Sequence, residues 1–539
     1  MHSFINKYYD ETKTTATMTR ISSIFIVGAA ASSLRGADPA GNKAMALSGG
    51  GFLALSTYAG LAADTDLSGK FALFDTISTV SGGSWFLAEL AYSDTFANLV
   101  QSLGNPVMEA ENTFQALWVK PFEKEIQQRG GTSLSGALVD VLKHLKLGKD
   151  DDFTKWIDDV EMAGAFGINN GAFNWTEAVS GLLSTQGILS STKTSAKVGS
   201  WAQGKTWLVG TTVSGDATLW ENTFHNLEYK SKDHQPPPAN QYPSRFTVGL
   251  GVKAPSNIFC PACDDLTFEY DGVGHCAFLG FKCQKQNGAS SPLGTDMDAN
   301  NLRLSHIVAA SSAFLGGVAE SPDLRSHQNL FSAPGGVFVP FASSGASDGF
   351  RILSAIDKAG EVDAAAMIQA SESQVKAVID GAYTDNTGIA NAVAAGHTDI
   401  VAWIQGTGMD TPSSLQDLFA GARSTVEQSM GIVQSRFQIF SFPTSSQFNI
   451  DFANWDSLHV QGTSQLEGIK YATVQATTAA NRFFGIKDAL KINLRIVYVG
   501  SKLNMGVGMK LEDYSTLVGE IVNTIRSNKF DPFAVAFEN

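Results

Sequence analysis

Positively charged residues are scarce in this sequence. Its 539 residues include 38 Lys and Arg against 52 Asp and Glu, so the formal net charge is −14. Nucleic acids and anionic membrane surfaces attract basic faces, and an acidic protein repels polyanions. We therefore expect no nucleic-acid partner and no membrane that attracts the chain by charge alone.

Long hydrophobic runs are also lacking, so we expect no transmembrane segment. The nearest approach is "ISSIFIVGAAASS" after Arg20, which ends in small residues with a suitable cleavage position after Ala31. This pattern is typical of a secretory signal, and we interpret residues 1–36 as a signal-like segment. A secreted or endomembrane-lumen protein follows from it. The alternative is a cytoplasmic protein in which "SIFIVGAA" is a first buried strand.

Cysteine is rare and clustered. All four cysteines lie in a loop that we place at 255–290, namely Cys260, Cys263, Cys276 and Cys283. In an oxidising compartment such a set forms two disulfides, whereas in the cytosol it binds zinc, with His275 as a spare ligand. Six residues separate the last two cysteines, which is more than the two to four of a zinc ribbon, so we favour disulfides with a structural role.

The remaining pattern alternates apolar strands with helices, which predicts an α/β fold. Strands are expected at 43–49, 73–80, 205–213, 245–252, 335–342, 399–406, 437–442 and 494–500, and helices at 52–63, 84–103, 134–147, 363–379, 414–434 and 513–527. We expect a single domain over 41–539, in which the more charged segment 104–200 is a helical cap or insertion. A proline-rich linker lies at 233–243.

The stretch "MALSGGGFLALSTYAG", residues 45–60, joins an apolar strand to a helix through three glycines. Such a turn leaves backbone N–H groups unpaired, with no side chains to block an anion. Phe52 and Leu53 stand where a Walker motif requires Lys and Ser or Thr, and the dinucleotide pattern of glycines is absent as well. An oxyanion hole for acyl transfer is the remaining interpretation.

The next stretch, "LFDTISTVSGGSWFLAEL" at 73–90, repeats this design with a serine at the turn. Gly82 and Gly83 permit a sharp turn that presents the Ser81 hydroxyl at a helix N-terminus. The helix dipole lowers the energy of a developing alkoxide, and the N–H that follows the serine joins the oxyanion hole. Ser81 is therefore the candidate nucleophile.

A base for this serine is expected in "VIDGAYTDNTGIANAVAAG", residues 378–396. An apolar strand delivers Asp380 to its end, followed by Gly381, and partial desolvation there raises the basicity of a carboxylate. Asp385 better fits a turn residue that accepts hydrogen bonds from its own backbone. We therefore predict Asp380 as the base.

These three pieces together resemble the cytosolic phospholipase A₂ and fungal phospholipase B (lysophospholipase) group, relatives of the plant patatins. The matching stretches are Ser48-Gly49-Gly50-Gly51-Phe52, Ser81-Gly82-Gly83-Ser84-Trp85 and Asp380-Gly381. The segments 306–317 and 398–406 are similar to the family as well, so the resemblance spans roughly residues 43–406. It implies a mixed central sheet with flanking helices and a helical cap.

The same resemblance implies the chemistry. It indicates a lipid acyl hydrolase of the phospholipase A or lysophospholipase type, which cleaves fatty-acyl esters of glycerolipids at a membrane or micelle surface without a cofactor. The implied site residues are the dyad Ser81 and Asp380, the oxyanion-hole glycines Gly49, Gly50, Gly51 and Gly82, and the substrate-binding residues Phe52, Leu53 and Trp85. No metal site is expected, because a calcium-loop-like stretch at 64–75 leads into a strand where an EF-hand needs a helix.

Two positions depart from the family pattern. The glycine usual two residues before the nucleophile is Thr79, and the arginine that commonly follows the glycine run to meet a lipid phosphate is Leu53. We therefore expect neutral acyl esters to be accepted beside phospholipids, and Leu53→Arg to favour phospholipids. Two alternatives remain open: a Ser-His-Asp esterase or lipase that uses His397 or His459, and a non-catalytic lipid-binding or storage protein of the same fold.

Overall fold

A computed structural model describes the chain over residues 43–128, 168–169, 172–173, 175–215, 241–253, 257–259, 275–278, 281–284, 303–313, 375–410, 412–420, 437–441, 452–460, 462–481, 484–503 and 511–534. The expected signal-like segment 1–36, most of the cysteine loop and the expected elements at 134–147 and 335–342 lie outside these residues. So do residues 233–240 of the expected linker, whereas its last residues, 241–243, belong to the described strand Gln241–Gly249. No helix of the described residues is long and apolar enough to cross a membrane.

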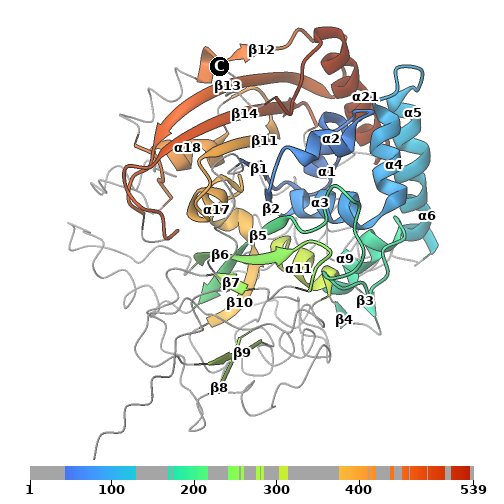
Figure 1. The fold of residues 1–539 in the computed structure, drawn as a ribbon. Coiled ribbons are helices and arrows are strands. Elements are labelled where there is room, and N and C mark those ends of the chain that lie inside the picture. Colours follow the sequence, from blue (N-terminus) through green and yellow to red (C-terminus); the bar gives the residue numbers. More distant parts are fainter. Residues whose placement is uncertain are drawn as a thin grey trace, which may run out of the picture. The chain divides into compact units, whose positions relative to one another are not determined.

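The described residues form a ten-stranded sheet, which Figure 1 shows with helices packed against it. Its strands follow the order β12 (Asp456–Ser457), β13 (Leu466–Thr477), β14 (Lys491–Ser501), β11 (Asp399–Thr407), β1 (Lys43–Leu47), β2 (Thr76–Val80), β5 (Thr206–Gly215), β6 (Gln241–Gly249) and β7 (Asn257–Phe259), while β10 (Val375–Asp380) pairs with β5 outside this path. Two short hairpins stand apart, β3 (Ile168–Asn169) with β4 (Ala172–Phe173) and β8 (His275–Phe278) with β9 (Phe281–Gln284).

The centre of the sheet is parallel and its flanks are antiparallel. Strands β14, β11, β1, β2 and β5 run in one direction. Strands β13, β6 and β10 are antiparallel to their neighbours, and so are the edge strands β12 and β7. The parallel strands are apolar and buried, as in sheets covered on both faces. The expected mixed α/β fold is thereby confirmed.

Helices α1 (Gly51–Leu61) and α3 (Gly82–Tyr92) start directly after β1 and β2. They pack on each other, and α1 also packs on α21 (Leu511–Asn528). The same group contains α4 (Asp94–Leu103), α5 (Ala110–Phe114), the π-helix η1 (Gln115–Val119) and α6 (Lys120–Gln128). The short helix α2 (Leu67–Ala72) lies between α1 and β2 in the chain. The remaining described helices are α9 (Trp175–Ser184), α11 (Leu304–Ser311), the 3₁₀ turn η4 (Gly381–Tyr383), α17 (Ile389–Ala394) and α18 (Ser413–Ala420).

Several sequence expectations differ from the structure. The expected helix 84–103 is broken at Ser93, whose hydroxyl accepts a hydrogen bond from the Phe96 N–H and so caps a new helix, α4. The expected helix 363–379 is wrong at its end, because residues 375–379 belong to β10. The expected strand 437–442 is only an isolated bridge in its described part. The long strand β13 was not expected, because many of its side chains are exposed or half-buried near the sheet edge and its apolar signal is weak.

Within the cysteine loop at 255–290, the structure describes the backbone of β7 and of the hairpin β8–β9, and the described cysteines lie in the hairpin. There Cys276 lies directly opposite Cys283 across the antiparallel pair. The expected disulfide pairing otherwise lies outside the described side chains and stays a prediction.

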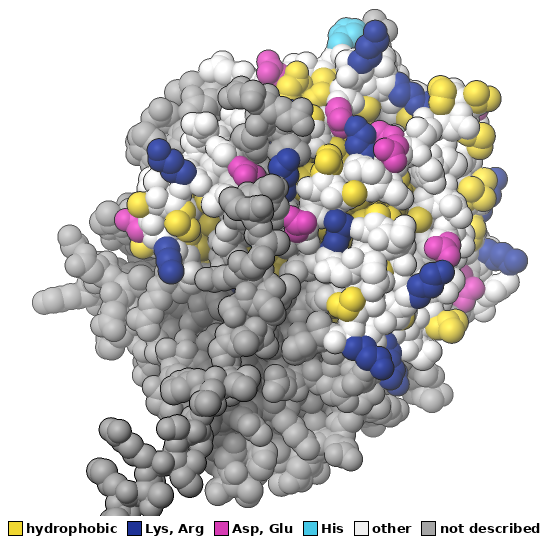
Figure 2. Space-filling model, viewed as in Figure 1, with side chains coloured by type: hydrophobic (Ala, Val, Ile, Leu, Met, Phe, Trp, Pro, Cys, Tyr) yellow, Lys and Arg dark blue, Asp and Glu magenta, His cyan; other side chains and the backbone are white. Residues whose placement is uncertain are grey.

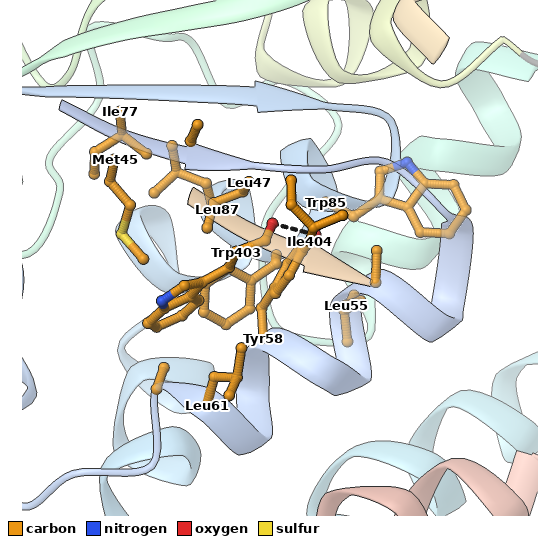
Figure 3. Close-up of a cluster of buried hydrophobic side chains, with 14 of the residues drawn as sticks. Met45, Leu47, Leu55, Tyr58, Leu61, Ile77, Trp85, Leu87, Trp403 and Ile404 are labelled. Carbon is orange, nitrogen blue, oxygen red and sulfur yellow. Dashed lines mark hydrogen bonds between the residues drawn. The ribbon is translucent and has the colours of Figure 1, made fainter. Parts of the chain in front are cut away.

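Below the central strands lies an apolar core. Figure 3 shows Met45 and Leu47 from β1, Ile77 from β2, Tyr58 from α1 and Trp403 from β11 in one cluster of buried side chains. The Tyr58 hydroxyl donates to the carbonyl oxygen of Trp403 at 3.1 Å, so α1 is tied to β11 by a polar contact within the core. On the face drawn in Figure 2, the described Lys and Arg side chains are interspersed with Asp and Glu.

Candidate active site

Two strands meet end to end on the same side of β5. Strand β2 runs parallel to the first half of β5 and ends with Val80 beside Gly210. Strand β10 runs antiparallel to the second half and ends with Asp380 beside Thr211. Because Gly210 and Thr211 are consecutive, the carboxyl ends of both strands come to one point. Ser81, the residue after β2, therefore meets Asp380 although 299 residues separate them.

Glycines make this meeting sterically possible. A Cβ on Gly381 would lie 2.6 Å from the Gly210 carbonyl oxygen and 2.9 Å from Val80 Cγ1, while a Cβ on Gly210 would lie 2.8 Å from Val80 Cγ2. All three distances are too short for real side-chain contacts. Any larger residue at either position would push the ends of β2 and β10 apart.

The Ser81 hydroxyl donates a hydrogen bond to Asp380 Oδ2 at 2.8 Å. Ser81 has φ 49° and ψ −122°, a conformation that L-residues other than glycine rarely adopt. The strained turn lets β2 pass straight into α3, and it places the hydroxyl at the positive end of the helix dipole.

Asp380 is fully buried, and that burial raises its pKa to about 7. Two hydrogen bonds act in the opposite direction, one from the Ala382 N–H to Oδ1 at 2.8 Å and one from Ser81. A carboxylate with a pKa near 7 is both ionised and basic at neutral pH, as a general base must be.

The hydroxyl groups of three residues make hydrogen bonds at the turn around Ser81 between β2 and α3, which we call the serine turn. Ser311, on α11, accepts a hydrogen bond from the Ser81 N–H at 3.0 Å and donates to the Gly210 carbonyl at 2.7 Å. Its oxygen also lies 2.9 Å from that of Ser84, which in turn lies 2.8 Å from Thr79 Oγ1. Thr79 thus has a structural role at the position where the sequence resemblance led us to expect glycine, and the positive φ of the turn falls on Ser81 itself.

The glycine turn after β1 lies directly against the serine turn. Gly50 has φ 135° and Gly51 has φ 54°, so both occupy backbone conformations that favour glycine. A Cβ on Gly82 would lie 2.6 Å from the Gly51 nitrogen, and one on Gly83 would lie 2.7 Å from the Ser48 carbonyl oxygen. The two turns therefore touch through bare backbone.

The four glycines expected in the oxyanion hole differ in what their N–H groups do. The Gly49 N–H donates to the Asn386 carbonyl oxygen at 2.9 Å, so it is already engaged. The N–H groups of Gly50, Gly51 and Gly82 have no hydrogen-bond partner within the part of the chain that the structure describes. These three donors stand at helix N-termini and are the groups available to a developing negative charge.

The residues expected to bind substrate lie in the core instead. Phe52, Leu53 and Trp85 are each 1% exposed. Phe52 packs edge-on against Trp85 and Trp118, with ring centroids 5.3 and 5.8 Å apart. This burial gives the three side chains a packing role below the turns, which the apolar sequence pattern could not separate from substrate contact.

Neither histidine of the alternative triad lies beside Ser81. His397 precedes Asp399, the first residue of β11, so it stands at the amino edge of the parallel strands, whereas Ser81 follows the carboxyl end of β2. His459 is exposed, and its N–H donates to Asn528 Oδ1 at 3.2 Å on the last turn of α21. The Ser81 hydroxyl reaches Asp380 directly.

Asp385 is the turn residue that the sequence indicated. Its Oδ1 accepts hydrogen bonds from the N–H and hydroxyl of Thr387 at 2.8 and 2.5 Å, and its Oδ2 accepts one from the Ala390 N–H at 3.0 Å. It holds the loop between β10 and α17. Among the described side chains, no group of three or more His, Cys, Asp or Glu is placed to hold a metal ion.

Sequence reasoning missed two residues that hold the glycine turn, Gln405 and Asn386. Gln405 lies on β11 and donates from Nε2 to the Gly49 carbonyl at 2.7 Å, while Asn386 accepts the Gly49 N–H. Gln405 directly follows the apolar run "IVAWI", residues 400–404, within the strand, and that break in the pattern was the available signal.

Comparisons with known proteins add little to this geometry. No family model matches the chain, and no curated protein matches it. Among solved structures, human GIVD cytosolic phospholipase A2 is similar with a TM-score of 0.35 and 12% sequence identity, over 91% of this chain. The match spans 59% of that protein's length. A likeness this remote identifies no residue or substrate.

Proposed function

We propose that this protein is a lipid acyl hydrolase that cleaves fatty-acyl esters with Ser81 as nucleophile and Asp380 as general base. The observation that carries the proposal is the 2.8 Å hydrogen bond from the Ser81 hydroxyl to the buried Asp380 carboxylate at the N-terminus of α3. Three backbone N–H groups without a partner among the described residues belong to the two adjoining turns. A nucleophile, a base and an oxyanion hole are the parts that acyl transfer requires.

In the first half of the reaction, Ser81 Oγ attacks the ester carbonyl carbon while Asp380 takes its proton. The carbonyl π electrons move to oxygen, and this oxyanion accepts hydrogen bonds from the N–H groups of Gly50, Gly51 and Gly82. When the tetrahedral intermediate collapses, the bond to the alcohol breaks and Asp380 returns the proton to the leaving oxygen. An acyl-Ser81 ester remains.

In the second half, water takes the place of the alcohol. Asp380 accepts a proton from the water as its oxygen attacks the acyl carbon, and the same N–H groups stabilise the second oxyanion. Collapse releases the fatty acid and returns the proton to Ser81 Oγ. The direct contact of Asp380 with Ser81 lets one carboxylate serve both halves.

The substrate class is supported by the motif resemblance, which covers the glycine turn, the serine turn and the aspartate. Neutral acyl esters are included because Leu53 stands where the family commonly has an arginine for the lipid phosphate. Leu53 is buried, however, so Leu53→Arg would place a charge in the core and is expected to destabilise the protein instead of favouring phospholipids. We therefore test headgroup preference with substrates alone.

The experiment compares a monoacylglycerol, a lysophospholipid and a diacyl phospholipid in mixed micelles, with fatty acid release followed by mass spectrometry. We expect wild-type protein to hydrolyse the neutral ester at a rate within about tenfold of the phospholipid, since the missing charge contact corresponds to ~1.4 kcal/mol. Ser81→Ala should release no fatty acid, whereas Ser102→Ala on α4 should match the wild type. Equal release by Ser81→Ala and wild type would contradict the proposal.

A further inference from the structure

Each of the two peptide groups that flank the Gly49 Cα makes one hydrogen bond, the Ser48–Gly49 peptide through its N–H and the Gly49–Gly50 peptide through its C=O. The Gly49 N–H donates to Asn386, and the Gly49 carbonyl accepts from Gln405 Nε2 at 2.7 Å. A peptide between two glycines has little steric resistance to a flip, because neither residue has a side chain to define φ and ψ. The hydrogen bond from Gln405 to the Gly49 carbonyl is therefore the contact that sets the orientation of the Gly49–Gly50 peptide.

The orientation of this peptide decides where the Gly50 N–H points. In a trans peptide the C=O and the next N–H lie in one plane and point in opposite directions. Since the Gly49 C=O points at Gln405, the Gly50 N–H is directed away from Gln405. A flip of this peptide would turn a carbonyl oxygen toward the oxyanion position and replace attraction by repulsion.

Gln405 contacts the glycine turn at three places. Its backbone N–H donates to Ser48 Oγ at 3.2 Å, its side chain donates to Gly49, and a Cβ on Gly50 would overlap its Nε2. Ser48 is itself fixed by Tyr58, whose hydroxyl lies 2.6 Å from Ser48 Oγ and also donates to the Trp403 carbonyl, the contact visible in Figure 3. The backbone of Gln405 and the Ser48 side chain that it contacts are therefore both held in place by hydrogen bonds.

Only the NH₂ half of the Gln405 carboxamide has a hydrogen-bond partner among the described residues. Its Nε2 donates to Gly49, while its Oε1 is buried and has no partner among the described residues. The opposite assignment of the amide would set Oε1 against the Gly49 carbonyl, oxygen against oxygen. A buried acceptor without a partner is unfavourable, and an apolar side chain would avoid that cost on the otherwise apolar strand β11.

We propose that Gln405 is a positioning residue for catalysis: its side-chain amide holds the Gly49–Gly50 peptide so that the Gly50 N–H serves the oxyanion hole. The proposal rests on the proposed acyl transfer at Ser81. It assigns to Gln405 a role in the transition state alone, because the oxyanion does not exist in the bound substrate.

The test replaces Gln405 by methionine, which has a similar length and no donor. Gln438→Met is the matched control, since Gln438 Nε2 also donates to backbone carbonyls. Its acceptors are the carbonyl oxygens of Phe419 and Phe440. Each variant is measured with a soluble ester and with its thionoester, in which sulfur replaces the carbonyl oxygen. Sulfur is a weak hydrogen-bond acceptor, so the thionoester gains little from an oxyanion hole.

For Gln405→Met we expect kcat on the oxygen ester to fall by about 10- to 100-fold. This loss should not exceed that for complete removal of one oxyanion donor, which is ~100-fold or more. KM should stay within about twofold of the wild type, and the ratio of oxygen ester to thionoester rates should fall in step with kcat. Gln438→Met should keep both the rate and the ratio.

Two results would overturn the proposal: a folded Gln405→Met with wild-type kcat, or a loss of kcat that leaves the ester ratio unchanged, which indicates general damage. If Gln405→Met does not fold, Gln405→Leu is measured with the same criteria. Ser81→Ala separates the two hypotheses, because full activity in that variant defeats the proposed function itself, while an inactive Ser81→Ala with an unaffected Gln405→Met defeats only the role of Gln405.

Discussion

The turns after β1 and β2 share a strand–turn–helix arrangement but differ in the group that they present to the candidate site. Both follow neighbouring parallel strands, in which Leu47 lies beside Thr79, and both lead directly into a helix. The first turn presents only backbone and places its positive φ angles on Gly50 and Gly51. The second places its positive φ on Ser81 and presents a side chain. One local design thus supplies either fixed dipoles or a reactive group.

The difference lies in what holds each turn. The serine turn is supported by hydroxyl groups, with Ser311 accepting the Ser81 N–H and lying beside Ser84. The glycine turn is held at its peptide groups by Gln405 and Asn386. Strain in a serine at φ 49° persists only where surrounding contacts determine it, and such strain gathers at functional sites. Substitutions in the two turns should therefore reduce activity by different amounts and for different reasons.

Breaking the serine turn should have the largest effect. Ser81→Ala, Asp380→Asn and the double variant should each lose turnover by a similar factor of about 10⁴ or more, because nucleophile and base act as one unit. Circular dichroism should show all three folded. A double variant much slower than either single variant, or an Asp380→Asn close to wild type, would contradict the dyad.

Breaking the glycine turn should reduce turnover by about 100-fold, the cost of one oxyanion donor. Gly50→Ala adds a Cβ that overlaps Gln405 at a backbone φ of 135°. Gly187→Ala is the control, because Gly187 also has a positive φ, 82°, and a Cβ there meets nothing within 4 Å. Comparable losses in both variants would mean that backbone strain alone, and not the turn, reduces activity.

The pH profile should distinguish the two turns. Burial raises the pKa of Asp380 to about 7, so the carboxylate is increasingly protonated below that pH and cannot accept the Ser81 proton. The kcat/KM of the wild type should fall about tenfold per pH unit below neutrality. Gly50→Ala should keep the same midpoint with a lower plateau, because its turn contains no titratable group. A flat profile between about pH 5 and 8 would argue against Asp380 as base.

A smaller loss of turnover is expected when the contact between Ser311 and the serine turn is removed. Ser311→Ala removes the acceptor of the Ser81 N–H and should reduce kcat by about fivefold, in line with ~1 kcal/mol for one hydrogen bond. The adjacent Ser312 donates to the Val308 carbonyl within its own helix, so Ser312→Ala is a close control. Equal rates for Ser311→Ala and wild type would show that the strained turn holds without this contact.

Sequence reasoning reached the parts of the site that are local. Each turn is a strand, a run of glycines and a helix, and these signals lie within 16 to 18 consecutive residues. The position of Asp380 was also indicated by its strand end, but how it reaches Ser81 was not, because β10 meets β2 only through their shared neighbour β5. Such pairing depends on tertiary structure.

Burial was the harder property to predict. Leu53 follows the glycines and looked like a substrate contact, yet α1 is buried along its whole length, and Leu53 with it. Gln405 looked like an ordinary strand residue, and only the register of β11 beside β1 brings its amide to the Gly49 carbonyl. In both cases the deciding contact comes from a distant element.

Covalent labelling tests the central claim most directly. A fluorophosphonate probe forms a bond to an activated serine oxygen with loss of fluoride, and peptide mapping by mass spectrometry identifies the residue. We predict one adduct per molecule on Ser81, formed rapidly by the wild type and far more slowly by Asp380→Asn, whose amide cannot take the proton. An adduct on another serine, or equal labelling rates for the two proteins, would contradict the account.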